Sequence, residues 1–192
     1  MSILPLIKSR RSIRKYKEQT VEKRVIEQVL EAGIWAPSSM NRQPWRFVVA
    51  EGKKKIQELS KQAKQDLGNY LETEEGKAHW GPEAAERFKL RVESEQDTIF
   101  YHAPVVIFVI QTLDTGNTFD YGLASQNMML EAHSLGLGTC AIGLAKPMNR
   151  SVEGRRMLGL KESEKIIMAI ILGYPAEEGH VKERKEDTIN WL

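Results

Sequence analysis

The amino-acid sequence predicts a single domain of the α+β class, and three observations support this. The length of 192 residues suits one domain or at most two small ones. Segments with apolar residues at helical spacing and short apolar strand-like segments follow one another without strict alternation, which favours α+β over a doubly wound parallel sheet. No repeat with a period of about 20–50 residues is visible, which argues against a solenoid. We therefore expect one domain over residues 1–192.

Composition is typical of a globular protein without a nucleic-acid or membrane partner. Hydrophobic residues make up 41% and charged residues 28% of the chain, which excludes disordered and fibrous proteins. The 28 basic and 26 acidic side chains leave a net charge of only +2. The longest apolar runs are far shorter than the roughly 18 residues that cross a bilayer, and the N-terminus is not a secretory signal. Because the single cysteine, Cys140, cannot form an internal disulfide, we expect a cytoplasmic location.

A polar loop separates the first predicted helix from the first predicted strand. Apolar residues recur at helical spacing over residues 21–35, with Thr20 as the expected N-cap. Pro37 ends this helix, because the residue before a proline is disfavoured in the α region. The polar loop over 38–43 then leads to an expected strand from Trp45 to Ala50.

The stretch between the first two strands is predicted to be helical with one irregular interruption. A helix follows Gly52, with apolar residues from Ile56 to Leu67 at helical spacing. Glycines, an asparagine and a proline break this periodicity over residues 68–82, which we interpret as a mobile loop or lid. A charged helix is expected over 83–100.

The second half of the chain is predicted to form the centre of the domain. Residues 104–111 are almost continuously apolar, so both faces of this strand are expected to be buried. Residues 119–135 form a helix that is apolar on most sides, as expected in the core of a monomer or along the interface of a dimer. The remaining expected elements are a strand or turn over 139–144, a small helix over 151–158 and a strand over 166–173. Three apolar strands make a small sheet, which leaves room for strands from a partner chain.

Standard catalytic and metal-binding signatures are absent from the sequence. Residues 136–141 have the spacing of a dinucleotide-binding glycine motif, but a helix precedes them and a strand follows, the reverse of the order that the motif requires. We therefore interpret Gly136 as the C-cap of the preceding helix and Cys140 as a small buried apolar residue. The four histidines are scattered and are interpreted as structural or exposed rather than as metal ligands: His79, His102, His133 and His180.

The basic N-terminal stretch is the first candidate binding segment. In an extended chain, Arg10, Ser12 and Arg14 point to one side, and guanidinium and hydroxyl groups bind phosphate well. The same residues are also compatible with a solvated surface patch or a nonspecific polyanion site.

Two further segments carry candidate binding residues. The loop over 37–45 supplies serine, asparagine and glutamine side chains to a polyhydroxylated or heterocyclic ligand, or it is an ordinary helix-to-strand connection. Gly143 permits close approach of the backbone to a flat ring. The basic residues of the tail over 182–185 would complete an anion site that Arg10 begins.

Taken together, these segments resemble the FMN-dependent nitroreductase family. The resemblance rests on RRSIRKY at 10–16, APSSMNRQPWRF at 36–47, GLGTCAIGL at 136–144 and ILGYP at 171–175, in the order found in the family. It covers essentially the whole chain, and the first two motifs together are highly specific. It implies a three-layer sandwich with a mostly antiparallel central sheet flanked by helices. It also implies a homodimer in which each C-terminal tail is exchanged to add to the partner's sheet, with the helix over 119–135 at the dimer centre.

The resemblance further implies which residues bind the phosphate end of FMN. Arg10 and Ser12 are expected to bind the phosphate, with Arg11 near the phosphate and the ribityl chain. Arg184 matches the late phosphate-binding arginine of the family.

At the ring end, Arg14 is expected near N1 and O2 of the flavin, and the backbone N–H groups of Ile142 and Gly143 are expected towards N5. The residues expected to reach the flavin of the other subunit are Pro37, Ser38, Ser39 and Asn41. Gln65 and Asn69 are further candidates for a polar contact with FMN.

The implied activity is that of an NAD(P)H-dependent oxidoreductase. Hydride would pass from NAD(P)H through flavin N5 to a nitroaromatic, a quinone or a similar electron-poor acceptor in a ping-pong cycle, with Arg14 stabilising negative charge and no side chain committed as acid or base. One alternative is a specialised branch of the family, such as a flavin destructase or a reductive dehalogenase. The other is a non-enzymatic protein that binds flavin or a polyanion.

Overall fold

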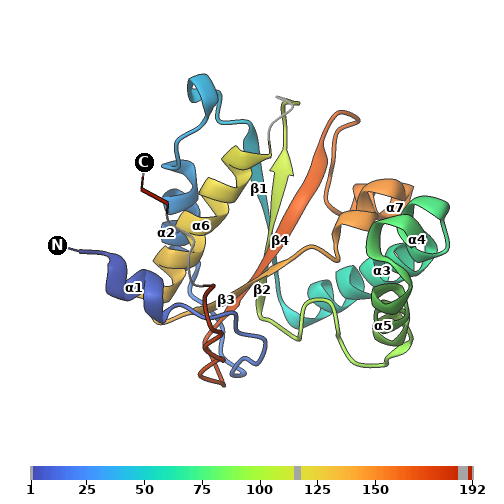
Figure 1. The fold of residues 1–192 in the computed structure, drawn as a ribbon, viewed down its shortest axis with the longest axis horizontal. Coiled ribbons are helices and arrows are strands. Elements are labelled where there is room, and N and C mark those ends of the chain that lie inside the picture. Colours follow the sequence, from blue (N-terminus) through green and yellow to red (C-terminus); the bar gives the residue numbers. More distant parts are fainter. Residues whose placement is uncertain (1, 115–117, 186–189, 192) are drawn as a thin grey trace.

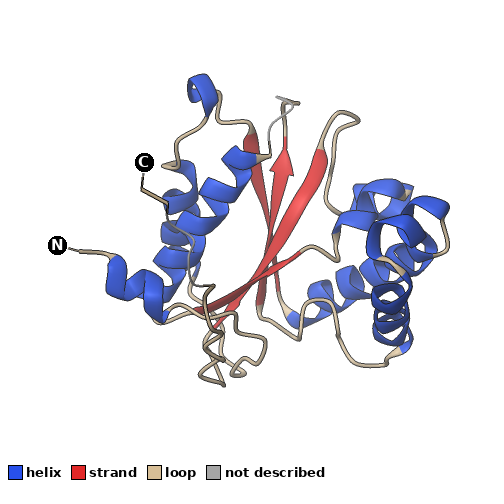
Figure 2. Cartoon of the chain, in the orientation of Figure 1, coloured by secondary structure: helices blue, strands red, loops and turns tan. Residues whose placement is uncertain are grey.

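A four-stranded antiparallel sheet lies between two layers of helices (Figures 1 and 2). The computed structural model describes residues 2–114, 118–185 and 190–191. Each neighbouring pair of strands is antiparallel, in the order β1-β2-β4-β3. The strands are β1 (Trp45–Glu51), β2 (Val105–Gln111), β3 (Gly138–Ile142) and β4 (Lys165–Gly173). The prediction of an α+β fold with helices on both sides of the sheet is confirmed.

The two helical layers have different sizes. One face of the sheet carries α2 (Lys23–Ile34) and α6 (Phe119–Ser134), with the short α1 (Leu4–Ser9) against α6 (Figure 1). The other face carries α3 (Lys53–Leu71), α4 (Glu74–Trp80), α5 (Pro82–Glu93), α7 (Val152–Met157) and the 3-10 helix η2 (Lys146–Arg150). A second 3-10 helix, η1 (Ser39–Asn41), precedes β1.

Strand β2 is buried on both faces, as its continuous apolar sequence predicts. Val106 and Phe108 belong to the hydrophobic core on the α3 side, whereas Val105 and Ile107 belong to the core on the α6 side. All four side chains are at most 2% exposed. Alternate side chains of a strand point to opposite faces, so one apolar segment supplies both cores.

Helix α6 ends as the glycine motif predicts. The N–H of Leu137 donates to the carbonyl of Ala132 at 2.8 Å, and the N–H of Gly136 donates to the carbonyl of His133 at 3.1 Å. Gly136 has a φ of +77°, which a glycine adopts without strain. This Schellman cap is followed directly by β3, so the prediction that Gly136 is the C-cap of the preceding helix is confirmed.

The prediction of an irregular loop over 68–82 is wrong, because most of this segment is helical. Helix α3 continues to Leu71, and α4 begins one residue after Thr73. The Thr73 hydroxyl accepts the N–H of Gly76 at 3.0 Å and so caps α4, while Pro82 begins α5 at a position where a missing N–H is tolerated. Gly81 and Pro82 therefore mark a helix boundary, whereas Gly68 and Asn69 lie within α3 and Gly76 lies within α4. A lid function for this segment stays a prediction.

Two other predicted helix boundaries are wrong. Thr20 is not the N-cap of α2, which begins at Lys23 after an extended Glu22 that makes no side-chain capping bond. The charged helix expected over 83–100 ends at Glu93. After the helix, the Asp97 carboxylate accepts the backbone N–H groups of Ile99, Phe100 and His102. These bonds form a turn and replace the hydrogen bonds that a continued helix would make.

Within the described residues, every helix is too short or too polar to traverse a lipid bilayer.

An ion pair between half-buried Arg46 and buried Glu164 joins the edge strand β1 to the loop before β4. The Arg46 Nε and Nη2 atoms donate to the two oxygens of the Glu164 carboxylate at 2.8 and 2.7 Å, and the N–H of Lys161 donates to the same carboxylate at 2.8 Å. The Glu164 side chain is only 4% exposed. The hydrogen bonds from Arg46, together with that from Lys161, lower the pKa of Glu164 to about 2.

We predict that Glu164→Gln lowers the free energy of unfolding at pH 7 by about 3 kcal/mol, because it leaves Arg46 without its counter-charge. The pKa of Glu164 is lower in the folded than in the unfolded protein, so its contribution is present above about pH 4.5 and is lost as the pH falls towards about 2. In urea titrations, the difference between wild type and variant should therefore shrink between pH 7 and pH 3.

The matched control is Glu153→Gln, which breaks an exposed pair with Arg156. This control is expected to change the free energy of unfolding far less. A Glu164→Gln effect that is equally small, or that does not depend on pH, would contradict the role given to the pair of Arg46 and Glu164.

Candidate functional site

The predicted binding residues form two groups at opposite ends of α6 (Figure 1). At its C-terminal end, the Ser9 hydroxyl, next to Arg10, lies 2.8 Å from Nε2 of His133. At its N-terminal end, the N–H of Ser39 donates to the Asp120 carboxylate at 3.3 Å. A helical rise of about 1.5 Å per residue separates His133 from Asp120 by about 20 Å. A ligand that contacts both groups must therefore take them from two chains, unless it spans the whole length of α6.

The first group lies along the free edge of β3. Ser12 forms a parallel bridge with Thr139, and the N–H of Ile13 donates to the carbonyl of Thr139 at 2.9 Å. Gly138 makes this approach possible, because a Cβ there would lie 2.8 Å from the side chain of Ile13. Ile13 is buried, so the alternation of an extended chain leaves Ser12 and Arg14 exposed on the other side. The predicted row of phosphate-binding side chains is thus placed beside β3.

A cavity of about 540 Å³ lies next to this segment. Its walls include Arg10, Arg11, His133 and the turns over 136–139 and 175–178. Burial lowers the pKa of His133, and the positive charges of Arg10 and Arg11 lower it further. The lowered pKa favours neutral His133, so the positive charge at the cavity comes from Arg10, Arg11 and Lys17, and Glu177 and Glu178 also line it. The two guanidinium groups suit an anionic group such as a phosphate.

Arg11 is partly committed to the fold. The Nη1 atom of its guanidinium donates to the carbonyl of Lys8 at 2.6 Å and to the carbonyl of Arg10 at 2.8 Å. These carbonyls lie at the C-terminal end of α1, where a positive charge is favourable. Arg10 and Ser12 are therefore better placed than Arg11 to bind a ligand directly.

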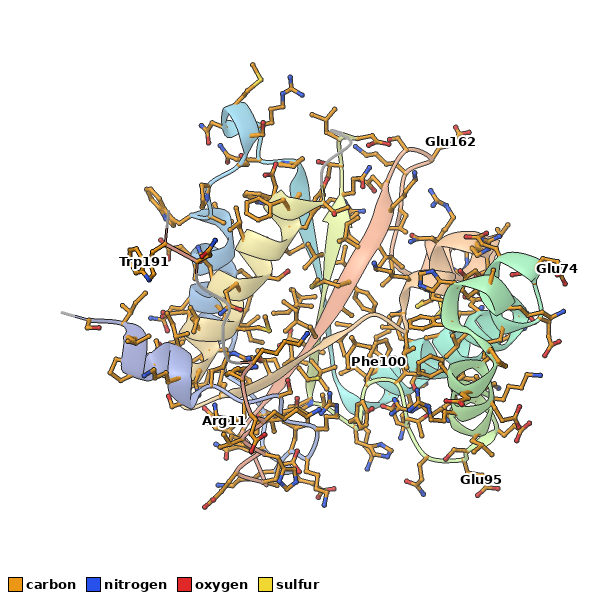
Figure 3. All side chains as sticks on the ribbon, viewed as in Figure 1. Arg11, Glu74, Glu95, Phe100, Glu162 and Trp191 are labelled. Carbon is orange, nitrogen blue, oxygen red and sulfur yellow. The ribbon has the colours of Figure 1, made fainter. Side chains whose placement is uncertain are left out.

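The C-terminal tail returns to the N-terminal segment. The N–H of Lys17 donates to the carbonyl of Tyr174, and the N–H of Ala176 donates to the carbonyl of Lys15, both at 2.9 Å. Gly179 then packs against Arg11, which lies where the tail passes the N-terminal segment (Figure 3). Arg184 is exposed further along this tail. Exchange of the tail between two chains stays a prediction.

The end of β3 provides the setting expected for a flat ring. Ile142 is buried at the end of the strand, and the following Gly143 is exposed with open space where a side chain would be. The guanidinium carbon of Arg14 lies 5.8 Å from the centre of the Tyr101 ring. The ring end of the predicted site therefore has the backbone of Ile142, the open space beside Gly143 and the positive charge of Arg14.

The second group is a rigid loop rather than an ordinary connection. Met40, Asn41 and Gln43 all have positive φ angles, which residues other than glycine seldom adopt. The Ser38 hydroxyl accepts the N–H of Gln43 at 2.9 Å, and buried Asp120 holds the N–H of Ser39. Pro37, Ser39 and Asn41 are exposed and Ser38 is half-buried. Strained loops that the surroundings hold in place are common at functional sites.

The prediction that Cys140 is a small buried residue is confirmed. Cys140 is buried, and burial raises the pKa of its thiol. Among residues 2–114, 118–185 and 190–191, no cluster of histidine, cysteine and acidic side chains is suited to hold a metal ion. Gln65 and Asn69 are both exposed on α3, and their contact with a cofactor stays a prediction.

Asp97 and Tyr101 lie at the site although no sequence motif pointed to them. Tyr101 has a φ of +56° in a turn held by Asp97, and its ring faces Arg14. Asp97 had a usable signal, since aspartate side chains often accept backbone N–H groups two or three residues later. Tyr101 had none, because an aromatic residue in a left-handed turn contradicts local preferences.

Comparisons with known proteins agree with this geometry. A model of the nitroreductase family matches residues 7–174. A protein of Methanothermobacter thermautotrophicus, provisionally named NADH dehydrogenase/NAD(P)H nitroreductase, is 32% identical over 183 residues, covering 92% of this chain and 79% of the relative. The 4-nitrobenzoate reductase of Pseudomonas putida is 27% identical over 202 residues, covering 92% and 86%. The crystal structure of a Bacteroides fragilis nitroreductase with bound FMN matches with a TM-score of 0.84 and 29% identity, covering 100% of this chain and 99% of that one.

Proposed function

Since this chain belongs to the nitroreductase family, we propose that it is an FMN-dependent oxidoreductase that uses NAD(P)H to reduce nitroaromatic compounds, quinones or similar electron-poor acceptors. The observation that carries the proposal is the row of exposed Ser12 and Arg14 beside the arginine-lined cavity at β3. When bound, FMN supplies the redox chemistry, taking hydride at N5 and passing it on.

At the phosphate end, Arg10, Ser12 and Arg184 would bind the FMN phosphate, with Arg11 supporting the ribityl side. The fit rests on the cavity of about 540 Å³, whose walls bring Arg10 and Arg11 together with His133. Guanidinium forks hold phosphate oxygens in pairs, and a hydroxyl adds a further donor.

At the ring end, Arg14 would hold a positive charge against the pyrimidine edge of the flavin, where negative charge collects on reduction. Ile142 and Gly143 would turn backbone N–H groups towards N5. The open space beside Gly143 supports this assignment, because a flat ring needs the backbone within contact distance.

The second half of the site would come from a partner chain in a homodimer. Pro37, Ser38, Ser39 and Asn41 would reach the flavin that the other subunit binds, since about 20 Å of helix separates them from Arg10 within one chain. Large apolar side chains are exposed close to this loop: Trp35 is 79% and Met40 82% exposed. Neighbouring exposed apolar side chains favour a surface that another chain covers.

We predict ping-pong kinetics for the protein loaded with FMN. Donor and acceptor would use the same open side of the ring in turn, so double-reciprocal plots with NADH or NADPH as donor and 4-nitrobenzoate or a quinone as acceptor should give parallel lines. Free FMN at the same concentration is the control. If neither NADH nor NADPH is oxidised when an acceptor is added, the proposed enzymatic function is wrong, and the alternative of a flavin-binding protein is favoured.

We predict that Arg10→Ala weakens FMN binding by about 1.5–3 kcal/mol, the range for a hydrogen bond to a charged group. The dissociation constant can be measured by titration of flavin fluorescence. Lys15→Ala is the matched control, since it removes the same charge from an exposed position in the same segment. Equal effects of the two substitutions would favour nonspecific attraction over a phosphate contact at Arg10.

We predict that two defective chains restore one site when they are combined. Arg10→Ala disrupts the phosphate end, and Ser39→Trp places bulk at an exposed position of the loop that would face the partner's flavin. In a mixed dimer, one site carries both defects and the other carries neither. Doubly tagged mixed dimers should therefore bind one FMN per dimer with wild-type affinity. A mixed dimer that recovers no such site would show that each chain binds FMN alone.

A further inference from the structure

Arg14 is exposed on the segment beside β3, and Tyr101 is the aromatic residue that its guanidinium faces, at 5.8 Å from the ring centre. An exposed arginine side chain samples many rotamers unless something holds it. A guanidinium is attracted to the face of an aromatic ring, by enough to favour one arrangement about two- to fivefold at an exposed site.

The backbone that carries Tyr101 is fixed by Asp97. The Asp97 carboxylate accepts the N–H groups of Ile99 at 3.2 Å, Phe100 at 2.8 Å and His102 at 3.0 Å. The Ser60 hydroxyl of α3 also donates to Asp97, at 2.5 Å. These bonds hold Tyr101 and His102 at φ angles of +56° and +54°. The turn is therefore tied to the body of the protein.

Two further contacts fix the position of the tyrosine ring. The Arg91 Nη1 of α5 donates to the Tyr101 phenol oxygen at 2.9 Å. Next to Tyr101, Phe100 is fully buried between the sheet and the α3 layer, edge-on to Phe108 at 5.8 Å (Figure 3). The ring is thus held both through its backbone and through its hydroxyl.

The carboxylate of Glu177 lies close to Arg14 and could compete with the Tyr101 ring for its guanidinium. Glu177 of the tail accepts the backbone N–H of Arg14 at 2.7 Å. A guanidinium that left the tyrosine ring would have this carboxylate within reach of its flexible side chain. Pairing with Glu177 would neutralise its charge and draw it away from the ring end of the site.

We propose that Tyr101 is a positioning residue that keeps the Arg14 guanidinium at the pyrimidine edge of the flavin and away from Glu177. By doing so it raises the reduction potential of the bound FMN without contacting the phosphate end. This inference rests on the proposed function, in which Arg14 faces that edge.

The test measures the midpoint potential of bound FMN against a reference dye, and the FMN dissociation constant, in the full-length protein. Tyr101→Asn removes the ring but keeps a residue that tolerates positive φ, and Tyr101→Gly does so with no backbone strain. Tyr101→Phe keeps the ring. His102→Asn is the matched control, because it changes the neighbouring left-handed residue of the same turn.

Arg14→Ala is expected to lower the equilibrium constant for reduction about tenfold, which is about 30 mV for a two-electron couple. Tyr101→Asn and Tyr101→Gly are expected to lower it about threefold, or about 14 mV. His102→Asn should stay at the wild-type potential, and Tyr101→Phe, which keeps the ring but loses its bond from Arg91, should lie between wild type and Tyr101→Asn. The Tyr101 and His102 variants should bind FMN within about twofold of wild type, and the potential of the double variant of Arg14→Ala with Tyr101→Asn should fall no further than that of Arg14→Ala.

The outcomes separate this inference from the function on which it rests. A wild-type potential in both Tyr101→Asn and Tyr101→Gly, with a lowered one in Arg14→Ala, overturns the role of Tyr101 alone. So does a double variant that falls below Arg14→Ala, or a loss of FMN binding in the Tyr101 variants. An unchanged potential in Arg14→Ala overturns the proposed position of Arg14 itself.

Discussion

The burial of β2 along its length, and of β4 from Ala169 to Gly173, is the constraint on which the rest of the structure depends. Their side chains fill a core on each side of the sheet, so helices must cover both faces and no room for a ligand remains over the central strands. Binding is left to the edges of the sheet. At the β3 edge, the N-terminal segment pairs with Thr139 and brings Arg10, Ser12 and Arg14 to the surface in a row. The same packing that stabilises the domain therefore decides where its functional side chains lie.

Helix α6 separates the two groups of candidate residues. It packs against α2 and the sheet along 16 residues, and this packing fixes the positions of both of its ends. The segment with Arg10 lies at its C-terminal end, and the loop with Ser39 lies at its N-terminal end. A rigid helix cannot shorten to bring the two together. The two family motifs that carry these residues, at 10–16 and 36–47, could therefore meet at one ligand if two chains contributed to each site.

Elements with a strong local pattern could be predicted from the sequence, and elements fixed by tertiary contacts could not. The apolar run that became β2 and the periodic residues of α6 lie within two residues of their predicted bounds. The segment over 68–82 has no helical periodicity of its own because it contains the end of α3 and the short helix α4, which begins at a Thr73 cap and is tied to η2 by the pair between Glu75 and Arg150. The family motifs identified Arg10 and its neighbours, but no local signal indicates that a tyrosine in a left-handed turn lies against Arg14.

Two loops at the proposed site share one device for holding strained backbone. In the loop before β1, residues such as Asn41 have positive φ angles. The carboxylate of Asp120 accepts the backbone N–H of Ser39 in this loop. Asp120 itself lies in the first turn of α6, where a negative charge is favourable. In the turn before β2, Tyr101 has a positive φ angle, and Asp97 binds three backbone N–H groups. Each strained residue costs about 1–3 kcal/mol, and hydrogen bonds to an ionised carboxylate are strong enough to offset that. Because such bonds are directional, they fix where each loop points, which the apolar core alone does not do.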